Sequence, residues 1–367
     1  MRVAVDARSL LCAEPRGEGK SLLTLYQHMT DCAPEVSVVF FGDEQAALYG
    51  GPLPLRTEVC LLPSRGMRLD LWQNLRLPFA ARSFDVLHCT SSSAPLWTPV
   101  PAVMTVHDII PLLGIDGHAI EAQTRFARGL ARGMRYARSI IAVSGHTRSD
   151  LVHRFPGCEG RVRVVHWGSP RSCCPLPPAT DPPYLLVFGG PSPRKNTAYT
   201  LERFAKAASR VADVQLEVVG VSDASYRDHL LVLAEQLGVA DRVRVRGFVD
   251  EPWLAAALAR STALLYLSRY EGFGLPLLEA VALGTPVIAS NSSSIPEVLG
   301  DPAGCFDLDE PVAIESAIAR VATDPVERER RLHAQTRALA RFDWNDAATR
   351  TLGLLKAAAQ AKRVLNG

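Results

Sequence analysis

Two glutamates, Glu271 and Glu279, enclose the segment of this sequence that is best suited to chemistry. Between them Gly272 and Gly274 allow a tight turn, and Pro276 suits the first turn of a helix because its φ is already helical. Apolar residues precede and follow the turn. The pattern predicts a strand, a glycine turn and a helix whose N-terminal N–H groups attract an anion. With a carboxylate on either side, such a turn could hold a phosphate together with the hydroxyl groups of a sugar or a ribose.

A pair of adjacent cations, Arg194 and Lys195, stands in the loop 189–196, which follows a predicted strand and opens a predicted helix. Two cations at a helix N-terminus could neutralise a diphosphate without forming a covalent bond to it. The turn 247–250 follows a further strand and could offer backbone groups to a nucleotide base. Each of these glutamates and cations could also be an ordinary surface or helix-start charge if it stood alone.

The first half of the chain offers His107 and Asp108 at the end of a predicted strand. Open α/β sheets bind their ligands at the carboxyl ends of parallel strands, although a structural histidine near a turn would give the same pattern. The loop 14–21 contains Gly17 and Gly19 but lacks the glycine cradle of a Walker A motif. It also lacks the third glycine of the dinucleotide-binding fingerprint. A glycine turn beside a ligand and a plain surface loop both remain open.

The elements that must position these residues alternate between strands and helices in two runs, which predicts an α/β fold with two doubly wound, mostly parallel sheets. The first run has strands at 3–6, 36–41, 59–62, 86–89, 103–108, 140–143 and 162–165, and helices at 22–30, 70–82 and 121–138. The second has strands at 184–188, 214–219, 243–245, 263–267 and 286–289, and helices at 197–209, 224–237, 251–259, 276–283, 311–322, 326–340 and 345–362.

The boundary between the runs lies where six prolines fall between Ser169 and Tyr184, a composition typical of a stiff, extended linker. We therefore expect a Rossmann-like domain at 1–170, a linker at 171–183 and a second Rossmann-like domain at 184–344. The closing segment 345–367 is expected to form a helix that packs back toward the first domain.

Composition narrows the function classes. The chain has 367 residues, of which 47% are hydrophobic and 21% charged, and its net charge of +2 indicates no nucleic-acid partner. Its eight cysteines form no C-x-x-C pair and no histidine cluster has zinc spacing, so reduced thiols and no metal are expected. The N-terminus enters a strand directly, and no apolar run approaches the roughly 20 residues of a membrane span. These features predict a cytoplasmic protein.

One predicted helix carries a row of arginines on a single face, spaced three or four residues apart. Such a row could dock on anionic lipid at the inner face of the cytoplasmic membrane, although a charged row is often only a solvated face. The candidate membrane residues are Arg125, Arg128, Arg132 and Arg135, and Arg138 continues the row.

Several of these segments together resemble the retaining glycosyltransferases of family 4, which have the GT-B fold. Glu271 and Glu279 match the E-x7-E motif of that family, within EGFGLPLLEAVALGTPVIAS. GGPSPRKN resembles its donor loop, TVHDIIPLL its His-Asp strand end, and FDWNDAATRTL its last helix, while IIAVSGHTRSDL and VVHWGS are similar to segments of its first domain. The resemblance implies an N-terminal acceptor domain and a C-terminal donor domain.

The resemblance also implies a role for each candidate. Glu271 would contact donor-sugar hydroxyls near C3 and C4, Glu279 would bind the ribose, and Arg194 and Lys195 would stabilise the leaving diphosphate. Further donor contacts would come from His107, Asp108, Gly17, Gly19, Gly190, Val249, Phe273, Gly274 and Leu275, with Lys20 as an assistant. The family needs no metal or other cofactor. It implies transfer of a hexose from a nucleotide-diphosphate sugar, GDP-mannose-like, to a sugar or lipid-linked acceptor in polysaccharide or lipopolysaccharide synthesis.

Two alternatives remain. The first is another enzyme of the same fold, an epimerase or a pyridoxal-dependent phosphorylase, for which Lys206 is the spare lysine in the second domain. The second is a non-catalytic subunit that binds a nucleotide sugar. Pyridoxal absorbance would identify a phosphorylase, and the lack of donor hydrolysis would favour the subunit.

Overall fold

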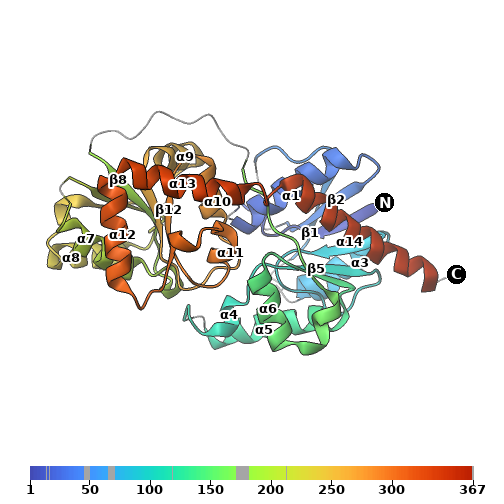
Figure 1. Ribbon diagram of the computed structural model, residues 1–367. Coiled ribbons are helices and arrows are strands. Elements are labelled where there is room, and N and C mark those ends of the chain that lie inside the picture. The colour runs from blue at the N-terminus through green and yellow to red at the C-terminus, as the bar shows by residue number, and fades with distance from the viewer. Residues whose placement is uncertain are drawn as a thin grey trace. The chain divides into compact units, whose positions relative to one another are not determined.

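The computed structural model describes residues 1–13, 15, 17–44, 50–64, 71–117, 119–170, 182–211 and 213–365, with side chains to 361. The chain divides into two compact units (Figure 1). The first consists of residues 1–114, 118–168 and 342–367, and the second of residues 115–117 and 169–341. Most of the predicted linker, 171–181, lies outside the described residues.

The first unit is built on a seven-stranded sheet whose neighbouring strands are all parallel, in the order β3-β2-β1-β4-β5-β6-β7. Strand β1 therefore lies between β2 and β4, and the winding direction reverses there, which is where open α/β sheets bind ligands. The strands are β1 (Arg2–Asp6), β2 (Ser37–Asp43), β3 (Thr57–Leu62), β4 (Val86–Cys89), β5 (Ala102–Val106), β6 (Ser139–Ala142) and β7 (Val162–Val164).

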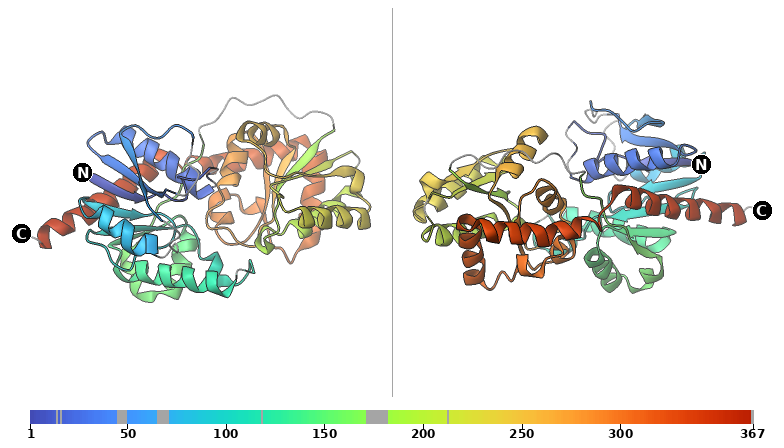
Figure 2. Two further views of the ribbon diagram at one scale, coloured as in Figure 1. Left: turned by 180° about the vertical axis from the view of Figure 1, so that it is seen from behind. Right: turned by 45° about the horizontal axis from the view of Figure 1, so that its top comes forward.

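Helices cover both faces of this sheet (Figure 2). On one face α1 and α14 pack against each other. On the other, Trp72, Leu130 and Leu151 join one buried apolar cluster with residues of the strands. The helices are α1 (Gly17–Cys32), the π-helix η1 (Trp72–Arg76), α3 (Leu77–Ala81), α4 (Ile110–Leu113), α5 (Ile120–Tyr136), α6 (Gly145–Arg154), the 3-10 helix η2 (Pro156–Arg161) and α14 (Trp344–Leu365).

The second unit contains a six-stranded parallel sheet in the order β10-β9-β8-β11-β12-β13, so its winding reverses between β8 and β11. Its strands are β8 (Tyr184–Phe188), β9 (Gln215–Val219), β10 (Val243–Val245), β11 (Ala263–Tyr266), β12 (Val287–Ser290) and β13 (Cys305–Phe306). Its α-helices are α7 (Thr197–Ala208), α8 (Ala224–Gln236), α9 (Glu251–Arg260), α10 (Leu275–Ala282), α11 (Ile295–Leu299), α12 (Pro311–Thr323) and α13 (Pro325–Leu339). Short 3-10 turns are η3 (Pro193–Lys195), η4 (Ala240–Arg242) and η5 (Pro302–Gly304).

The two predicted parallel sheets are confirmed, and three local predictions need correction. Helix α1 begins at Gly17, so the prediction of a loop is wrong from 17 to 21; Glu18 in the first turn suits the positive end of the helix dipole. Strand β5 ends at Val106, and the His107–Asp108 pair follows the strand instead of closing it. The helix expected at 70–82 is a π-helix continued by α3, observed between Leu71 and Ala81. Among the described helices, none is long and apolar enough to cross a membrane.

Candidate active site

The predicted strand, glycine turn and helix are observed between β11 and α10. All four residues of β11 are buried, and α10 begins directly after Gly274 with Pro276 in its first turn. Gly274 has a φ of +104°, a conformation that side chains rarely adopt, so this position requires glycine. Because Gly274 is also the N-cap, no side chain caps the helix start. The turn thus presents the positive end of α10 to its surroundings.

Two serines of the loop after β12 hold the backbone of this turn. The Glu271 N–H donates to Ser293 Oγ at 2.8 Å. The fully buried Ser294 hydroxyl lies 2.9 Å from the carbonyl oxygen of Glu271 and 2.8 Å from that of Phe273. Sequence reasoning missed both serines, because a run of serines after a strand also suits an ordinary loop. Their contacts fix the main chain that leads into α10.

The carboxylate of Glu271 lies between the two predicted cations. Arg194 Nη1 donates to Glu271 Oε2 at 2.8 Å, and Lys195 Nζ donates to Oε1 at 3.0 Å. Ser268 Oγ also donates to Oε1, at 2.9 Å. Arg194 and Lys195 belong to η3, which follows β8, and β8 is the direct neighbour of β11 in the sheet. Strand pairing therefore brings together residues that are more than seventy positions apart in the sequence.

These contacts keep Glu271 charged. Burial alone raises the pKa of Glu271, but the charges of Lys195 and Arg194 outweigh it, and the pKa falls below its ordinary value. Burial, followed by the nearby Glu271 charge, raises the pKa of Tyr266 well above its usual range. The Lys195 ammonium lies 5.5 Å from the centroid of the Tyr266 ring, within the range of a cation–π contact. The site therefore has fixed charges over a neutral phenol.

Glu279 lies half-buried on α10, and it adds to the negative charge that raises the pKa of Tyr266, after burial and Glu271. Both carboxylates of the motif thus act on one side chain. Asp116 was not predicted. It belongs to the three-residue segment that groups with the second unit, and its Oδ2 accepts from Arg194 Nε at 3.1 Å. The charges of Arg194 and Lys195 are therefore compensated by carboxylates within this unit.

The loop that carries the cations is braced against the turn. Asn196 adopts a left-handed φ of 56°, and its Nδ2 donates to the Leu267 carbonyl at 3.1 Å. The Arg269 N–H donates to the Arg194 carbonyl at 2.7 Å, and Arg269 Nε donates to Asn196 Oδ1 at 3.2 Å. The positions of Arg194 and Lys195 are consequently set by main-chain contacts as well as by Glu271.

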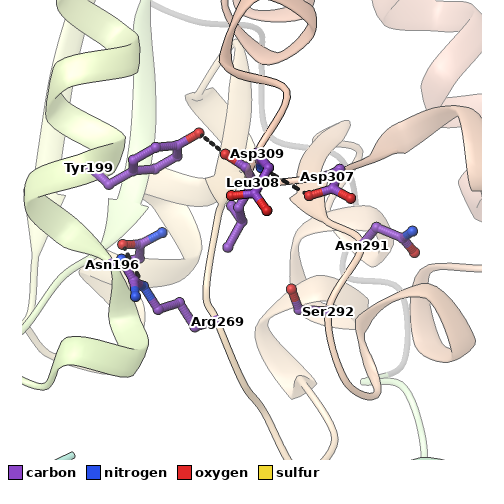
Figure 3. Close-up of a pocket in the computed structure, with 8 residues that line it drawn as sticks. All are labelled: Asn196, Tyr199, Arg269, Asn291, Ser292, Asp307, Leu308 and Asp309. Carbon is purple, nitrogen blue, oxygen red and sulfur yellow. Dashed lines mark hydrogen bonds between the residues drawn. The ribbon is translucent and has the colours of Figure 1, made fainter. Parts of the chain in front are cut away.

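A polar pocket of about 340 Å³ adjoins this brace (Figure 3). On one side Tyr199 Oη donates to the Leu308 carbonyl at 2.6 Å, and the Asp309 N–H donates to Asp307 Oδ1 at 2.9 Å. The pocket shares Asn196 and Arg269 with the brace, so changes to its lining would reach the cation loop. It is lined by Asn196, Tyr199, Arg269, Asn291, Ser292, Asp307, Leu308 and Asp309.

In the first unit, two contacts hold the imidazole ring of His107 in place. Its Nε2 lies 2.8 Å from the carbonyl oxygen of Thr90, which can only accept, so Nε2 is the donor. The ring also lies against Trp167, with centroids 5.8 Å apart. The neighbouring Asp108 accepts from the Ile110 N–H at 2.9 Å, at the start of α4. Because Nε2 of His107 carries the hydrogen, Nδ1 is the acceptor when the imidazole is neutral.

The predicted glycines differ in what requires them. A Cβ on Gly19 would lie 2.1 Å from the Ser9 carbonyl oxygen, so helix α1 can approach that backbone only with glycine there. Gly17 starts α1 and would accept a side chain without contact. Gly190 donates its N–H to Thr197 Oγ1 at 3.1 Å, and Val249 lies half-buried in the loop after β10.

Comparison with known proteins identifies the family. The model of Glycosyltransferase Family 4 matches residues 15–169, and that of Glycosyl transferases group 1 matches residues 175–339. The chain is 28% identical over 270 residues to O-antigen chain mannosyltransferase B of Escherichia coli, covering 70% of each chain. It is 27% identical over 245 residues to the MMP alpha-(1->4)-mannosyltransferase of Mycolicibacterium hassiacum. That match covers 65% of this chain and 57% of the relative.

Solved structures show the same fold. Sucrose-phosphate synthase from Thermosynechococcus elongatus superposes with a TM-score of 0.71 at 20% identity, covering 98% of this chain and 100% of that one. Anabaena Alr3699/HepE in complex with UDP and glucose gives 0.71 at 19% identity, with 97% and 100% covered. The two parallel sheets thus form a GT-B fold. The chain belongs to the group 1/family 4 glycosyltransferases, which makes it an enzyme that transfers a sugar from a nucleotide sugar.

Proposed function

We propose that the protein is a retaining, metal-independent hexosyltransferase acting in polysaccharide or lipopolysaccharide synthesis. It moves a hexose from a nucleotide-diphosphate sugar to a sugar or a lipid-linked oligosaccharide. The observation that carries this proposal is the cluster of Arg194, Lys195 and Glu271 beside the uncapped start of α10. The mannosyltransferases among its relatives favour a GDP-mannose-like donor.

The reaction breaks the bond between the anomeric carbon and the diphosphate oxygen, and a bond to the acceptor oxygen forms on the same face. The acceptor's proton passes to the leaving phosphate. Negative charge grows on the diphosphate as its bond breaks, and Arg194 and Lys195, already held in place, stabilise that charge without reorganising. Glu271 accepts hydrogen bonds from both cations and has a lowered pKa, so it is better suited to hold sugar hydroxyls than to attack carbon.

The remaining roles follow the family pattern. We assign Glu279 to the ribose hydroxyls, and His107, through its Nδ1 edge, to the donor sugar. The phosphates would meet the backbone of Phe273, Gly274 and Leu275, and Gly17 and Gly19 at the start of α1 with Lys20 beside them. Asp108, Gly190 and Val249 would complete the donor contacts.

The donor is tested by thermal unfolding with UDP-, GDP-, dTDP- and ADP-sugars. We expect GDP-mannose to raise Tm the most, because a ligand that binds only the folded state stabilises it. The donor that raises Tm should also be hydrolysed slowly to the sugar with the retained anomeric configuration, which NMR measures. A chain that is stabilised by no nucleotide sugar would contradict the proposal, and one that binds a donor but never hydrolyses or transfers it would be a non-catalytic subunit. Lys206, the phosphorylase candidate, lies exposed on α7.

Helix α5 bears the predicted arginine row on its outer side, opposite the buried Gly129, Leu130, Gly133 and Met134. We propose that this row contacts anionic lipid. Arg125, Arg128 and Arg135 are exposed. Arg132 is half-buried, and its Nε donates to the Ala94 carbonyl at 3.4 Å, so this arginine also has a contact within the unit.

Replacing Arg125, Arg128 and Arg135 together with Glu should release the protein from anionic vesicles in a sedimentation assay, because each change reverses a charge near the lipid surface. The matched control replaces three exposed arginines of the second unit, Arg227, Arg320 and Arg337. If both triple variants sediment like the wild type, the row on α5 is only a solvated face.

A further inference from the structure

Five large apolar side chains are exposed on one surface of the first unit. Their exposed fractions lie between 41% for Trp97 and 59% for Leu96. Three of them follow one another at intervals of four residues, one just before η1, one in η1 and one in α3. The other two lie in the loop between β4 and β5. We call Leu71, Leu75, Phe79, Leu96 and Trp97 the apolar patch.

Spacing along the helix and two contacts connect the members of the apolar patch. The rings of Phe79 and Trp97 meet edge to face with centroids 5.4 Å apart. The Leu96 N–H donates to Asn74 Oδ1 at 2.7 Å, which ties the loop to the π-helix. In the same helical segment Trp72 is only 1% exposed and belongs to the buried cluster of the unit. The segment therefore contributes Trp72 to the core and leaves Leu75 and Phe79 exposed, and among the described residues of this unit no packing covers them.

Basic residues adjoin the apolar patch. The loop that carries Leu96 and Trp97 also contacts α5, since the Ala94 N–H donates to the Gly129 carbonyl at 3.4 Å and Arg132 donates back to Ala94. Helices α3 and α5 contribute to the same buried cluster and thus cover the same face of the sheet. On the described part of the patch helix itself, the exposed charged residue is Arg76, and Arg82 follows directly.

We propose that the apolar patch inserts into the interfacial layer of an anionic bilayer while the α5 arginines contact lipid phosphates. Tryptophan and phenylalanine suit the boundary between headgroups and acyl chains, and stable attachment needs an apolar signal combined with a basic one. A second copy of the chain fits less well, because a two-fold contact through the patch would bring two basic surfaces together. The inference adds a membrane attachment to the proposed function, which includes a lipid-linked acceptor. It rests on the proposed function only for that acceptor.

The test uses vesicles of phosphatidylglycerol and phosphatidylcholine in equal parts. The triple variant Leu75→Ser, Phe79→Ser and Trp97→Ser should lose about tenfold or more in partitioning, because it removes three exposed apolar contacts with lipid. The control replaces Leu231, Val232 and Val326 with Ser; these are exposed apolar residues of the second unit, and partitioning should stay at the wild-type level. Equal binding of the patch variant and the wild type would overturn the inference.

A second measurement follows Trp97 itself. Brominated lipids should quench part of the tryptophan fluorescence of the wild type, and Trp97→Phe should abolish that part. Quenching that is identical in both proteins would place Trp97 outside the bilayer. Sedimentation velocity without lipid provides another contrary outcome: a wild-type dimer that Trp97→Ser dissociates would make the patch a contact between two copies.

The patch variant also separates this inference from the proposed function. It should keep the wild-type thermal shift with the nucleotide sugar and the wild-type rate of donor hydrolysis, since none of the three residues belongs to the donor site. If donor binding persists while even the wild type ignores vesicles, the membrane inference fails alone. If no nucleotide sugar binds the wild type, the proposed function fails, whatever the vesicles show.

Discussion

Lys195→Ala is expected to lower kcat by about 100- to 1,000-fold, the usual effect of removing one fixed donor that stabilises charge in a transition state. The Lys195 ammonium lies 3.0 Å from Glu271 Oε1 and its side chain is only one-fifth exposed, so its position is defined. The fold should survive, because Arg194 and Ser268 still donate to Glu271 in the variant. Steady-state kinetics with the donor identified by thermal unfolding, together with circular dichroism, measures both effects.

Two further variants make this result specific. Lys206→Ala removes another lysine a few turns along from the same loop, on the exposed side of α7, and should leave kcat unchanged. Lys195→Arg keeps the charge but changes its geometry and should recover part of the rate. A Lys195→Ala enzyme whose KM rises while kcat stays at the wild-type value would show that Lys195 binds the donor and its transition state equally. That outcome would refute its role toward the leaving group.

The fold could be predicted from the sequence because its strands are short apolar runs between turn residues. The predicted strands 184–188 and 243–245 coincide with β8 and β10. The errors arise at element ends and in the type of one helix, and the start of α1 shows why. Gly17 and Gly19 favoured a loop, yet Gly19 is needed for the close approach of α1 to Ser9, which depends on the tertiary structure.

The candidate residues could be chosen from the sequence by their types, but their contacts could not be predicted. The cation loop and Glu271 meet only because β8 and β11 are neighbours, and the order of strands in a sheet is not written in local patterns. Ser293, Ser294 and Asp116 had no signal of their own, since serines and an aspartate in loops are common. Family resemblance suggested roles for the charged residues, whereas the structure supplied the hydrogen bonds that hold them.

The sequence also did not show which apolar side chains of the first unit are exposed. The helix expected at 70–82 contains apolar residues around most of its circumference, and a core helix would have the same composition. Only the structure separates Trp72, which is buried, from Phe79, which is 54% exposed. The arginine row on α5 was visible from its spacing, but its connection to an apolar surface depends on the loop between β4 and β5.

Glu271→Gln is expected to lower kcat/KM by about 10- to 100-fold, which corresponds to losing hydrogen bonds from a charged group worth roughly 1.5–3 kcal/mol. The amide keeps the size of the carboxylate but cannot accept from Arg194 and Lys195 with both of its polar atoms. It would also turn an N–H group toward a cation or a sugar hydroxyl. Glu279→Gln is the matched change at the other end of the motif. Because we propose that Glu279 binds the ribose, this change should act mainly on KM for the nucleotide sugar.

The pH dependence of stability distinguishes the charge of Glu271 from its shape. Its pKa is lowered in the folded protein, so its stabilising effect is complete above the ordinary value of 4.5 and is lost as the pH falls through the lowered pKa. The difference in free energy of unfolding between the wild type and Glu271→Gln should therefore shrink as the solution is acidified below 4.5. A difference that is constant with pH would mean that the cations stabilise Glu271 no more than they stabilise a neutral amide. The carboxylate between Arg194 and Lys195 would then matter for its contacts with the sugar alone.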